Sequence, residues 1–352
     1  MNEDFITRLG HALREAADRE ERRTARKRAL LTASARVPRL AGGVPVGAVL
    51  ALGVVLLVGV YALLATRPEP AQPPGPKVVA RLTPGGVLDQ VQAGFGSAWA
   101  FDRIDDKLLR LDPATRRVTA RIGVRAGIAV SVGSDAVWVT EGVNDLVRID
   151  PRTNRVAARI PLERGAFSGG VPLPIGNTVW VVGEQRALRV DARTNRITKA
   201  ITVARSGYAV RGGAVLDGDL WLATSDLRLV RLDGRTGAVE ATFRAPFGGE
   251  LAAFAEGLYL ASPTEAARLD PATGRITWRA RYADVGAAAE ARGLIWVESR
   301  DRNGDRVIAI DPRNGRLVTS VHVGEFGVLS LGRVGSELWM TTAGGHLIVL
   351  RP

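Results

Sequence analysis

The sequence contains 352 residues and no cysteine, which excludes disulfides, thiol catalysis and cysteine-ligated metal sites. Its three histidines, His11, His322 and His346, are far apart in the sequence, so a histidine-based metal centre is not expected. The formal charge is +12, and arginine outnumbers lysine 44 to 4. Such a charge is compatible with nucleic-acid binding only if the basic domain shares a compartment with nucleic acid.

An uncharged segment separates Arg39 from Arg67, and residues 43–66 within it are long and apolar enough for one transmembrane helix. The residues before it are basic and include no acid after position 21: Arg22, Arg23, Arg26, Lys27, Arg28, Arg36 and Arg39. The positive-inside rule therefore predicts a cytoplasmic amino terminus, an extracytoplasmic remainder in the cell envelope and no nucleic-acid partner. The alternative is a cleaved signal peptide, but its charged region would be far too long, and Leu63-Leu64-Ala65 lacks the small residue expected three positions before the cut.

Four regions follow from this pattern. Residues 1–42 form a cytoplasmic basic segment, in which apolar residues at helical spacing predict a short helix that either has no partner or docks a cytoplasmic regulator. Residues 43–66 form the transmembrane helix, and residues 67–76 form a stiff linker with five prolines. Residues 77–352 form a repeat domain.

Six turns of similar sequence recur in the repeat domain. The motif runs Asp-Pro-x-Thr-Asn/Gly-Arg with minor changes, and its aspartates lie 37 to 42 residues apart, at Asp112, Asp150, Asp191, Asp233, Asp270 and Asp311. The aspartate accepts hydrogen bonds from the N–H groups ahead of it, proline presets φ, and Asn or Gly takes the left-handed position. Each motif therefore predicts a hairpin turn.

An aromatic residue in an apolar strand recurs seven times, at Trp99, Trp138, Trp180, Trp221, Tyr259, Trp296 and Trp339. Spacing this regular is typical of core packing between neighbouring units and not of a cofactor site. Each unit contains four short strands, which in the first unit cover about 88–93, 98–102, 107–112 and 118–123. Four strands per unit of about 40 residues predict an all-β fold, a seven-bladed β-propeller.

The two ends of the repeat domain complement each other. The seventh unit stops at Leu350, after its third strand. Lys77-Val-Val-Ala-Arg-Leu82 precedes the first unit and resembles the fourth strands Val118-Thr-Ala-Arg-Ile122 and Val156-Ala-Ala-Arg-Ile160. We therefore predict that this early strand completes the last blade, which removes two exposed strand edges.

The Trp-Val-Thr strand, the Ile-Asp-Pro-x-Thr-Asn strand pair and the Gly-rich return resemble YVTN-type and NHL-type propeller repeats, a pattern shared with the streptogramin lyases. The resemblance covers residues 77–352 and implies the fold, because its motifs are turn and core residues. As an enzyme family, the lyases imply a histidine and a glutamate near the central channel. His322 falls in an outer strand and His346 in a hairpin, so neither is expected to face the channel.

Binding side chains are expected in loops, since the strands are occupied by blade packing. The loops between second and third strands share one face, the upper face, with the loops that join blades; the Asp-Pro turns lie on the opposite, lower face. The candidate binding residues are polar residues of the upper face: Asp102, Asp105, Glu141, Asn144, Glu184, Asp226, Glu265 and Asp301. No catalytic residue, cofactor or metal is expected, because no carboxylate pair stands out, no nucleotide motif occurs, and Asp301-Arg-Asn-Gly-Asp305 lacks the distant Glu of a calcium loop.

Two functions follow from these observations. The first is a non-catalytic binding, sensing or scaffold module on the cell envelope, with an unknown envelope protein or ligand on the upper face. The second is a lyase-like or other hydrolytic enzyme. The lower face carries an arginine beside nearly every turn, which predicts contact with an anionic membrane surface; the alternative is that these arginines only keep the turns soluble.

Overall fold

The structure, a computed structural model, describes residues 75–142, 145–162, 170–254, 257–282, 285–301, 304–325 and 327–352. The predicted cytoplasmic segment, transmembrane helix and most of the linker lie outside these residues. Residues Pro74–Pro352 form one compact unit, the repeat domain. No helix within the described ranges is long and apolar enough to cross a membrane.

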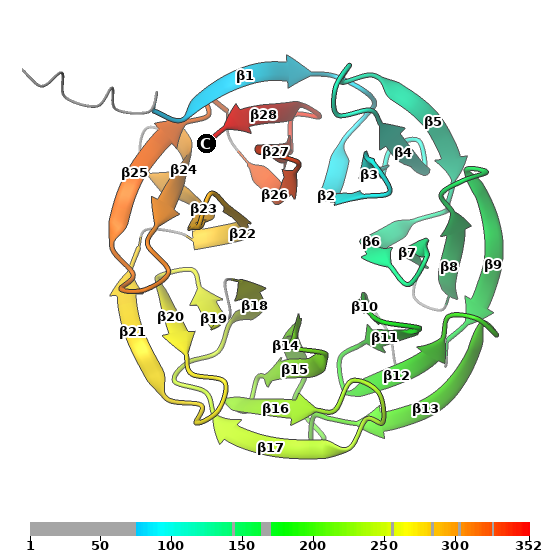
Figure 1. The fold of residues 1–352 in the computed structure, drawn as a ribbon, viewed down its shortest axis with the longest axis vertical. Helices are drawn as coiled ribbons and strands as arrows, with labels where there is room; N and C mark the ends of the chain where they lie inside the picture. The colour runs from blue at the N-terminus through cyan, green and yellow to red at the C-terminus, as the bar shows by residue number, and fades with distance from the viewer. Residues whose placement is uncertain are drawn as a thin grey trace, which may run out of the picture. The chain divides into compact units, whose positions relative to one another are not determined.

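Seven four-stranded antiparallel sheets are arranged as blades around a central axis (Figure 1). Blade one contains β2 (Leu88–Gly94), β3 (Ser97–Asp102), β4 (Lys107–Leu111) and β5 (Val118–Gly123). Blade two contains β6 (Gly127–Gly133), β7 (Ala136–Glu141), β8 (Asp145–Asp150) and β9 (Arg155–Pro161). Blade three contains β10 (Val171–Ile175), β11 (Thr178–Val182), β12 (Arg186–Asp191) and β13 (Arg196–Thr202).

The remaining blades repeat this order. Blade four contains β14 (Val210–Leu216), β15 (Asp219–Thr224), β16 (Arg228–Leu232) and β17 (Val239–Arg244), and blade five contains β18 (Glu250–Phe254), β19 (Gly257–Ser262), β20 (Glu265–Leu269) and β21 (Ile276–Arg281). Blade six contains β22 (Val285–Ala291), β23 (Leu294–Asp301), β24 (Gly304–Ile310) and β25 (Leu317–His322). Blade seven contains β26 (Val328–Val334), β27 (Glu337–Thr342), β28 (Leu347–Arg351) and β1 (Lys77–Leu82). The first strand of each numbered series is innermost and the last is outermost.

The early strand closes the ring as predicted. Strand β1 pairs antiparallel with β28, from Lys77 opposite Arg351 to Leu82 opposite Leu347. Its apolar side chains serve two interfaces, because Val78 packs on the cluster between blades six and seven, whereas Val79 and Leu82 pack on the cluster between blades seven and one. The prediction of seven blades closed by the amino-terminal strand of the domain is therefore confirmed.

The recurrent aromatics are core residues, also as predicted. Trp99 of blade one is buried and packs with Val137 and Val147 of blade two, and the other tryptophans of the series are buried in the same way. The indole N–H of Trp99 donates to the carbonyl of Gly94 at 3.0 Å, so its polar atom is satisfied inside the core. Neighbouring blades are thus joined by apolar clusters that belong to both.

The Asp-Pro turns follow the predicted chemistry with one departure. The Asp150 carboxylate accepts the N–H of Arg152 at 2.8 Å, and this hydrogen bond lowers the pKa of Asp150. Asn154 takes the left-handed position with φ of 58°, and Asn or Gly does so in four further turns. In the first turn Arg116 adopts φ of 58° at this position, a conformation that Asn or Gly would adopt with less strain.

A second recurrent arginine connects adjacent blades and was not recognised in the sequence. Arg110 lies 5.1 Å from the centre of the Trp99 ring of its own blade. Its Nη1 donates to the Pro151 carbonyl at 2.6 Å and to Asn154 Oδ1 at 2.9 Å, both in the lower turn of blade two. Arg148 repeats the arrangement over Trp138. The signal was the x-Arg-x-Asp order at the end of the third strand, which blades one to five share.

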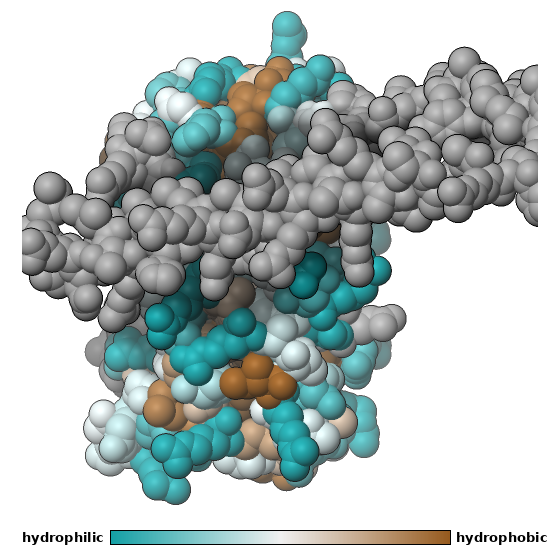
Figure 2. Space-filling view, turned by 90° about the vertical axis from the view of Figure 1, so that its left-hand side faces the viewer, coloured by the Kyte–Doolittle hydropathy of each residue, from teal (hydrophilic) through white to brown (hydrophobic). Residues whose placement is uncertain are grey.

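Seen from the rim at the left of Figure 1, the described surface is mostly hydrophilic, with small separate hydrophobic areas (Figure 2). Exposed apolar residues occur on the outermost strands there, among them Ile276 of β21 and Leu317 and Val318 of β25. The outer strands alternate in exposure, as expected for sheet edges with one packed side.

Candidate functional site

The acids predicted to form the upper-face site include several that lie at strand ends and not in free loops. Asp102 is the last residue of β3 and is fully buried. Its Oδ2 accepts the N–H of Gly86 at 2.8 Å, and its Oδ1 accepts the N–H of Ile104 at 3.1 Å. Asp102 therefore fixes the loop that enters blade one, and its carboxylate is already occupied.

Glu141 has the same position in blade two. It ends β7, is buried, and accepts the N–H of Arg125 at 2.7 Å and the Nε of Arg159 at 2.9 Å. Burial alone would raise the pKa of Glu141, but the hydrogen bond and charge of Arg159, together with the Arg125 contacts, outweigh it and hold the pKa below its usual value. Glu141 is thus a stable anion and is poorly suited to donate a proton.

Asp305, which the sequence places in a loop, lies in β24 and is buried. It accepts the Nε of Arg300 at 2.7 Å and the N–H of Val328 at 2.8 Å. Burial raises the pKa of Asp305, but these two donors more than compensate, so the net shift is downward. Asp301 is the last residue of β23 and pairs with Gly304 of β24, so it lies in a strand and not in a free loop.

Of the remaining candidates, Asp226 and Glu265 are paired with arginines, whereas Asp105 and Glu184 lie in exposed turns. Asp226 accepts the Nε of Arg228 at 2.7 Å and the hydroxyl of Thr224, and these bonds lower its pKa against the opposing effect of burial. Glu265 forms a bidentate pair with Arg279 at 2.7 and 2.8 Å. Asp105 and Glu184 lie in exposed turns of the upper face, and Asn144 lies outside the described residues.

A cleft of about 660 Å³ lies on the upper face and is lined by residues of blades four to seven. The innermost strands contribute residues near their starts, and the second strands contribute residues at their ends; the polar ones are Arg211, Ser225, Glu250, Ser262 and Glu298. Arg211 and Glu250 are exposed and make no ion pair with another described residue. These two side chains are therefore available to a ligand.

Sequence reasoning did not find this cleft, because it searched the loops between second and third strands. The cleft is instead lined by polar residues at the beginning of innermost strands, such as Glu250, the first residue of β18, which follows Gly248-Gly249. That position was visible as a charged residue at the start of an otherwise apolar strand. Only the ring arrangement brings the starts of the innermost strands together.

The two described histidines lie away from the cleft. His322 is exposed at the end of the outermost strand β25, in agreement with the prediction. His346 lies in the turn between β27 and β28, where its Nδ1 is 2.9 Å from Glu325 Oε2. Glu325 also accepts Arg81 Nη1 at 2.8 Å and the Thr342 hydroxyl at 3.1 Å. Neither histidine lines the cleft.

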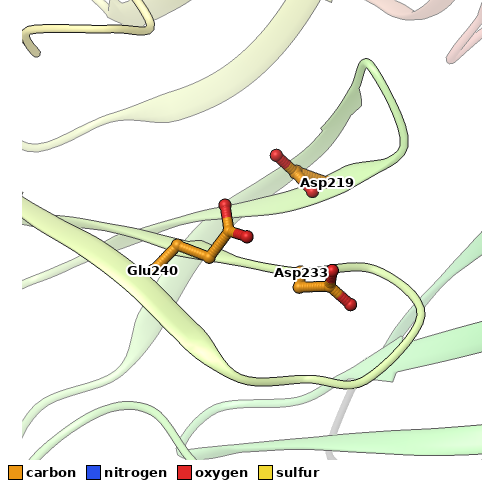
Figure 3. A group of neighbouring side chains, drawn as sticks. All are labelled: Asp219, Asp233 and Glu240. Carbon is orange, nitrogen blue, oxygen red and sulfur yellow. The ribbon is translucent and has the colours of Figure 1, made fainter.

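Three acids approach one another on the lower face of blade four (Figure 3). Arg231 pairs with two of them: its Nη2 lies 2.5 Å from Asp219 Oδ2 and its Nε lies 3.1 Å from Glu240 Oε2. The hydrogen bond to Asp219 raises the pKa of Arg231. Asp233 accepts the N–H groups of its own turn. The guanidinium therefore occupies the place that a cation would take.

Comparison with known proteins supports the fold and does not assign a family. No protein-family model matches the chain, and no curated protein matches its sequence. Among solved structures, BamB from Moraxella catarrhalis is similar with a TM-score of 0.54 and 19% identity, over 76% of this chain and 83% of that protein. At this identity the likeness shows the fold alone. The resemblance to YVTN-type and NHL-type repeats thus extends to the propeller architecture, while membership of either family is not shown.

Proposed function

We propose that this protein is a non-catalytic binding or scaffold module, a propeller displayed outside the cytoplasm on one membrane span. The observation that supports it is the cleft on the upper face of blades four to seven, which presents Arg211 and Glu250 without ionic partners among the described residues. A concave site with a few convergent polar groups is the usual form of a ligand site. The resemblance to BamB supports the propeller fold and specifies neither a role nor a partner.

The electrostatics of the upper face favour binding over acid–base catalysis. A general acid or base works best with a pKa near the operating pH. In Glu141, Asp226 and Asp305 the pKa is instead lowered, because arginines and backbone N–H groups overcome the effect of burial. These carboxylates bind arginines and backbone N–H groups of the chain itself, and none of them lines the cleft.

The binding role is tested by capture from an envelope extract with the propeller fragment 73–352. We expect a partner that is retained by the wild-type fragment and by Thr153→Arg, a lower-face control, and that is lost with Ser262→Arg, which places a long cation in the cleft. Capture that is indifferent to Ser262→Arg contradicts the assignment of the cleft. For the membrane span over residues 43–66, we expect the full chain to resist alkaline extraction and protease added to intact cells to remove the propeller.

One observation favours a second function. His346 is oriented by Glu325 at 2.9 Å, an arrangement that suits a general base. Its position outside the cleft is the reason to rank a lyase-like activity second. Turnover of a streptogramin by the purified fragment that disappears with His346→Ala would establish the enzyme, and absence of turnover in the wild type supports the binding module.

A further inference from the structure

An apolar cavity of about 160 Å³ lies between blades five and six and adjoins the cleft of the upper face. Glu250, Ala261 and Gly286 border both spaces, so the cavity begins where the cleft ends. A dry apolar cavity of about 150 Å³ is large enough to bind a benzene ring. The cavity can therefore take one aromatic or branched aliphatic group from a ligand seated in the cleft.

The cavity has its origin in two departures from the repeat. Tyr259 stands where the other six blades have tryptophan, and its ring is smaller than indole. Ala266 stands where blades one, two, four and seven have leucine. Both residues line the cavity, together with Phe254 and Trp278, whose rings lie 5.9 and 6.0 Å from the Tyr259 ring. Three aromatic rings thus line the space into which an aromatic group would enter.

One carboxylate, that of Glu250, stands at the border between the cavity and the cleft. Glu250 is exposed there and has no ionic partner among the described residues. Glu298 lines the cleft but not the cavity; it is buried, its Oε2 would be 1.9 Å from a Cβ on Gly286, and its Oε1 pairs with Arg300 at 3.6 Å. Arg211 lines the outer cleft and not the cavity. A ligand that extends from the cavity into the cleft thus meets apolar side chains first, then the negative charge of Glu250, and then the positive charge of Arg211.

We propose that this composite site binds an α-ammonium group that carries an aromatic or large apolar side chain. The side chain enters the cavity between blades five and six, the ammonium donates charge-assisted hydrogen bonds to Glu250, and the adjoining carbonyl or carboxylate faces Arg211. A free aromatic amino acid and the amino terminus of a peptide share this chemistry. The inference names the ligand class of the cleft and rests on the proposed binding function.

The proposal is tested by calorimetric titration of the full-length chain with phenylalanine, phenylalanine amide and Phe-Gly-Gly. We expect N-acetylation of the ligand to weaken binding at least about tenfold, since it removes the charge-assisted bonds. Replacement of phenylalanine amide by alanine amide should weaken binding about tenfold or more, because the ring leaves the cavity empty. Tighter binding of the free amino acid identifies that source, and tighter binding of Phe-Gly-Gly identifies a peptide terminus.

Two variants separate the parts of the site. Glu250→Gln should reproduce the effect of N-acetylation, while Glu240→Gln, an exposed acid on the outer strand of blade four, should leave binding unchanged. Ala266→Leu restores the residue that other blades carry, so the fold should tolerate it, and it should abolish the preference for phenylalanine over alanine. A melting temperature no lower than that of the wild type checks its folding.

The proposal is overturned if none of the three ligands binds at about 10 mM, or if binding ignores both N-acetylation and Ala266→Leu. These results would leave the wider binding function intact if the envelope partner is still lost with Ser262→Arg. Conversely, ligand binding without any captured partner would retain the composite site and refute the scaffold role.

Discussion

Closure of the ring by β1 gives the most direct test of the architecture. Deletion of residues 73–83 from the propeller fragment leaves the fragment 84–352, in which the outer edge of β28 and the apolar clusters on both sides of blade seven are uncovered. The ladder between β1 and β28 contains five residue pairs, and a backbone hydrogen bond contributes about 1 kcal/mol net.

The apolar contacts of β1 also contribute to the free energy of unfolding. Val78, Val79 and Leu82 are partly buried, and partial burial of such side chains stabilises a fold by roughly 1 kcal/mol each. With about one hydrogen bond per ladder pair, the total loss is about 8 kcal/mol, compared with roughly 5–15 kcal/mol for the stability of a typical native protein. The truncated fragment should therefore be aggregated or melt far below the fragment 73–352.

The assay is thermal and urea unfolding of the two fragments, followed by tryptophan fluorescence. A synthetic peptide of residues 75–84, added during refolding of the truncated fragment, should pair with β28 and restore the higher midpoint. Equal melting temperatures for the two fragments would refute the closure energetics, and a rescue by a scrambled peptide would show that pairing in register is not required.

Three further predictions concern single positions. The pKa of Glu141 is lower in the folded than in the unfolded protein, so the ionised side chain stabilises the propeller above the unfolded pKa of about 4.3, and this stabilisation is lost as the pH falls through the folded pKa. Glu141→Gln should therefore lower the free energy of unfolding by about 1–2 kcal/mol at neutral pH and make stability depend less steeply on pH in acid. An unchanged acid-unfolding curve would count against the pairing of Glu141 with Arg159. Arg110→Ala should lower stability by about 1–3 kcal/mol, whereas the exposed Arg117→Ala should not, because only Arg110 reaches the next blade. If the lower face lies against the membrane, a cysteine at Thr153 should react with bulky external reagents more slowly than one at Asp105 in intact cells, and anionic vesicles should bind the fragment at low salt; equal labelling would contradict the orientation.

The sequence was sufficient for the fold because its information is local and repeated. Each Asp-Pro turn fixes a hairpin through hydrogen bonds within a few residues, such as Asp150 to Arg152. Each Trp marks a strand that is buried on both sides, and the match of Lys77–Leu82 to later fourth strands identified the partner of β28. Turn chemistry and binary patterning therefore determined the number of blades and the manner of closure.

The site was decided by tertiary structure. The acids that we selected from the sequence, such as Asp102 and Glu141, accept hydrogen bonds from N–H groups and arginines of segments 16 to 18 residues away. No local sequence pattern indicates these partners. The cleft unites residues from four blades, and its polar members are ordinary in isolation. Tyr259 and Ala266 each look like conservative changes within the repeat, and only their meeting at one interface creates a cavity, because packing volume depends on both sides of a contact.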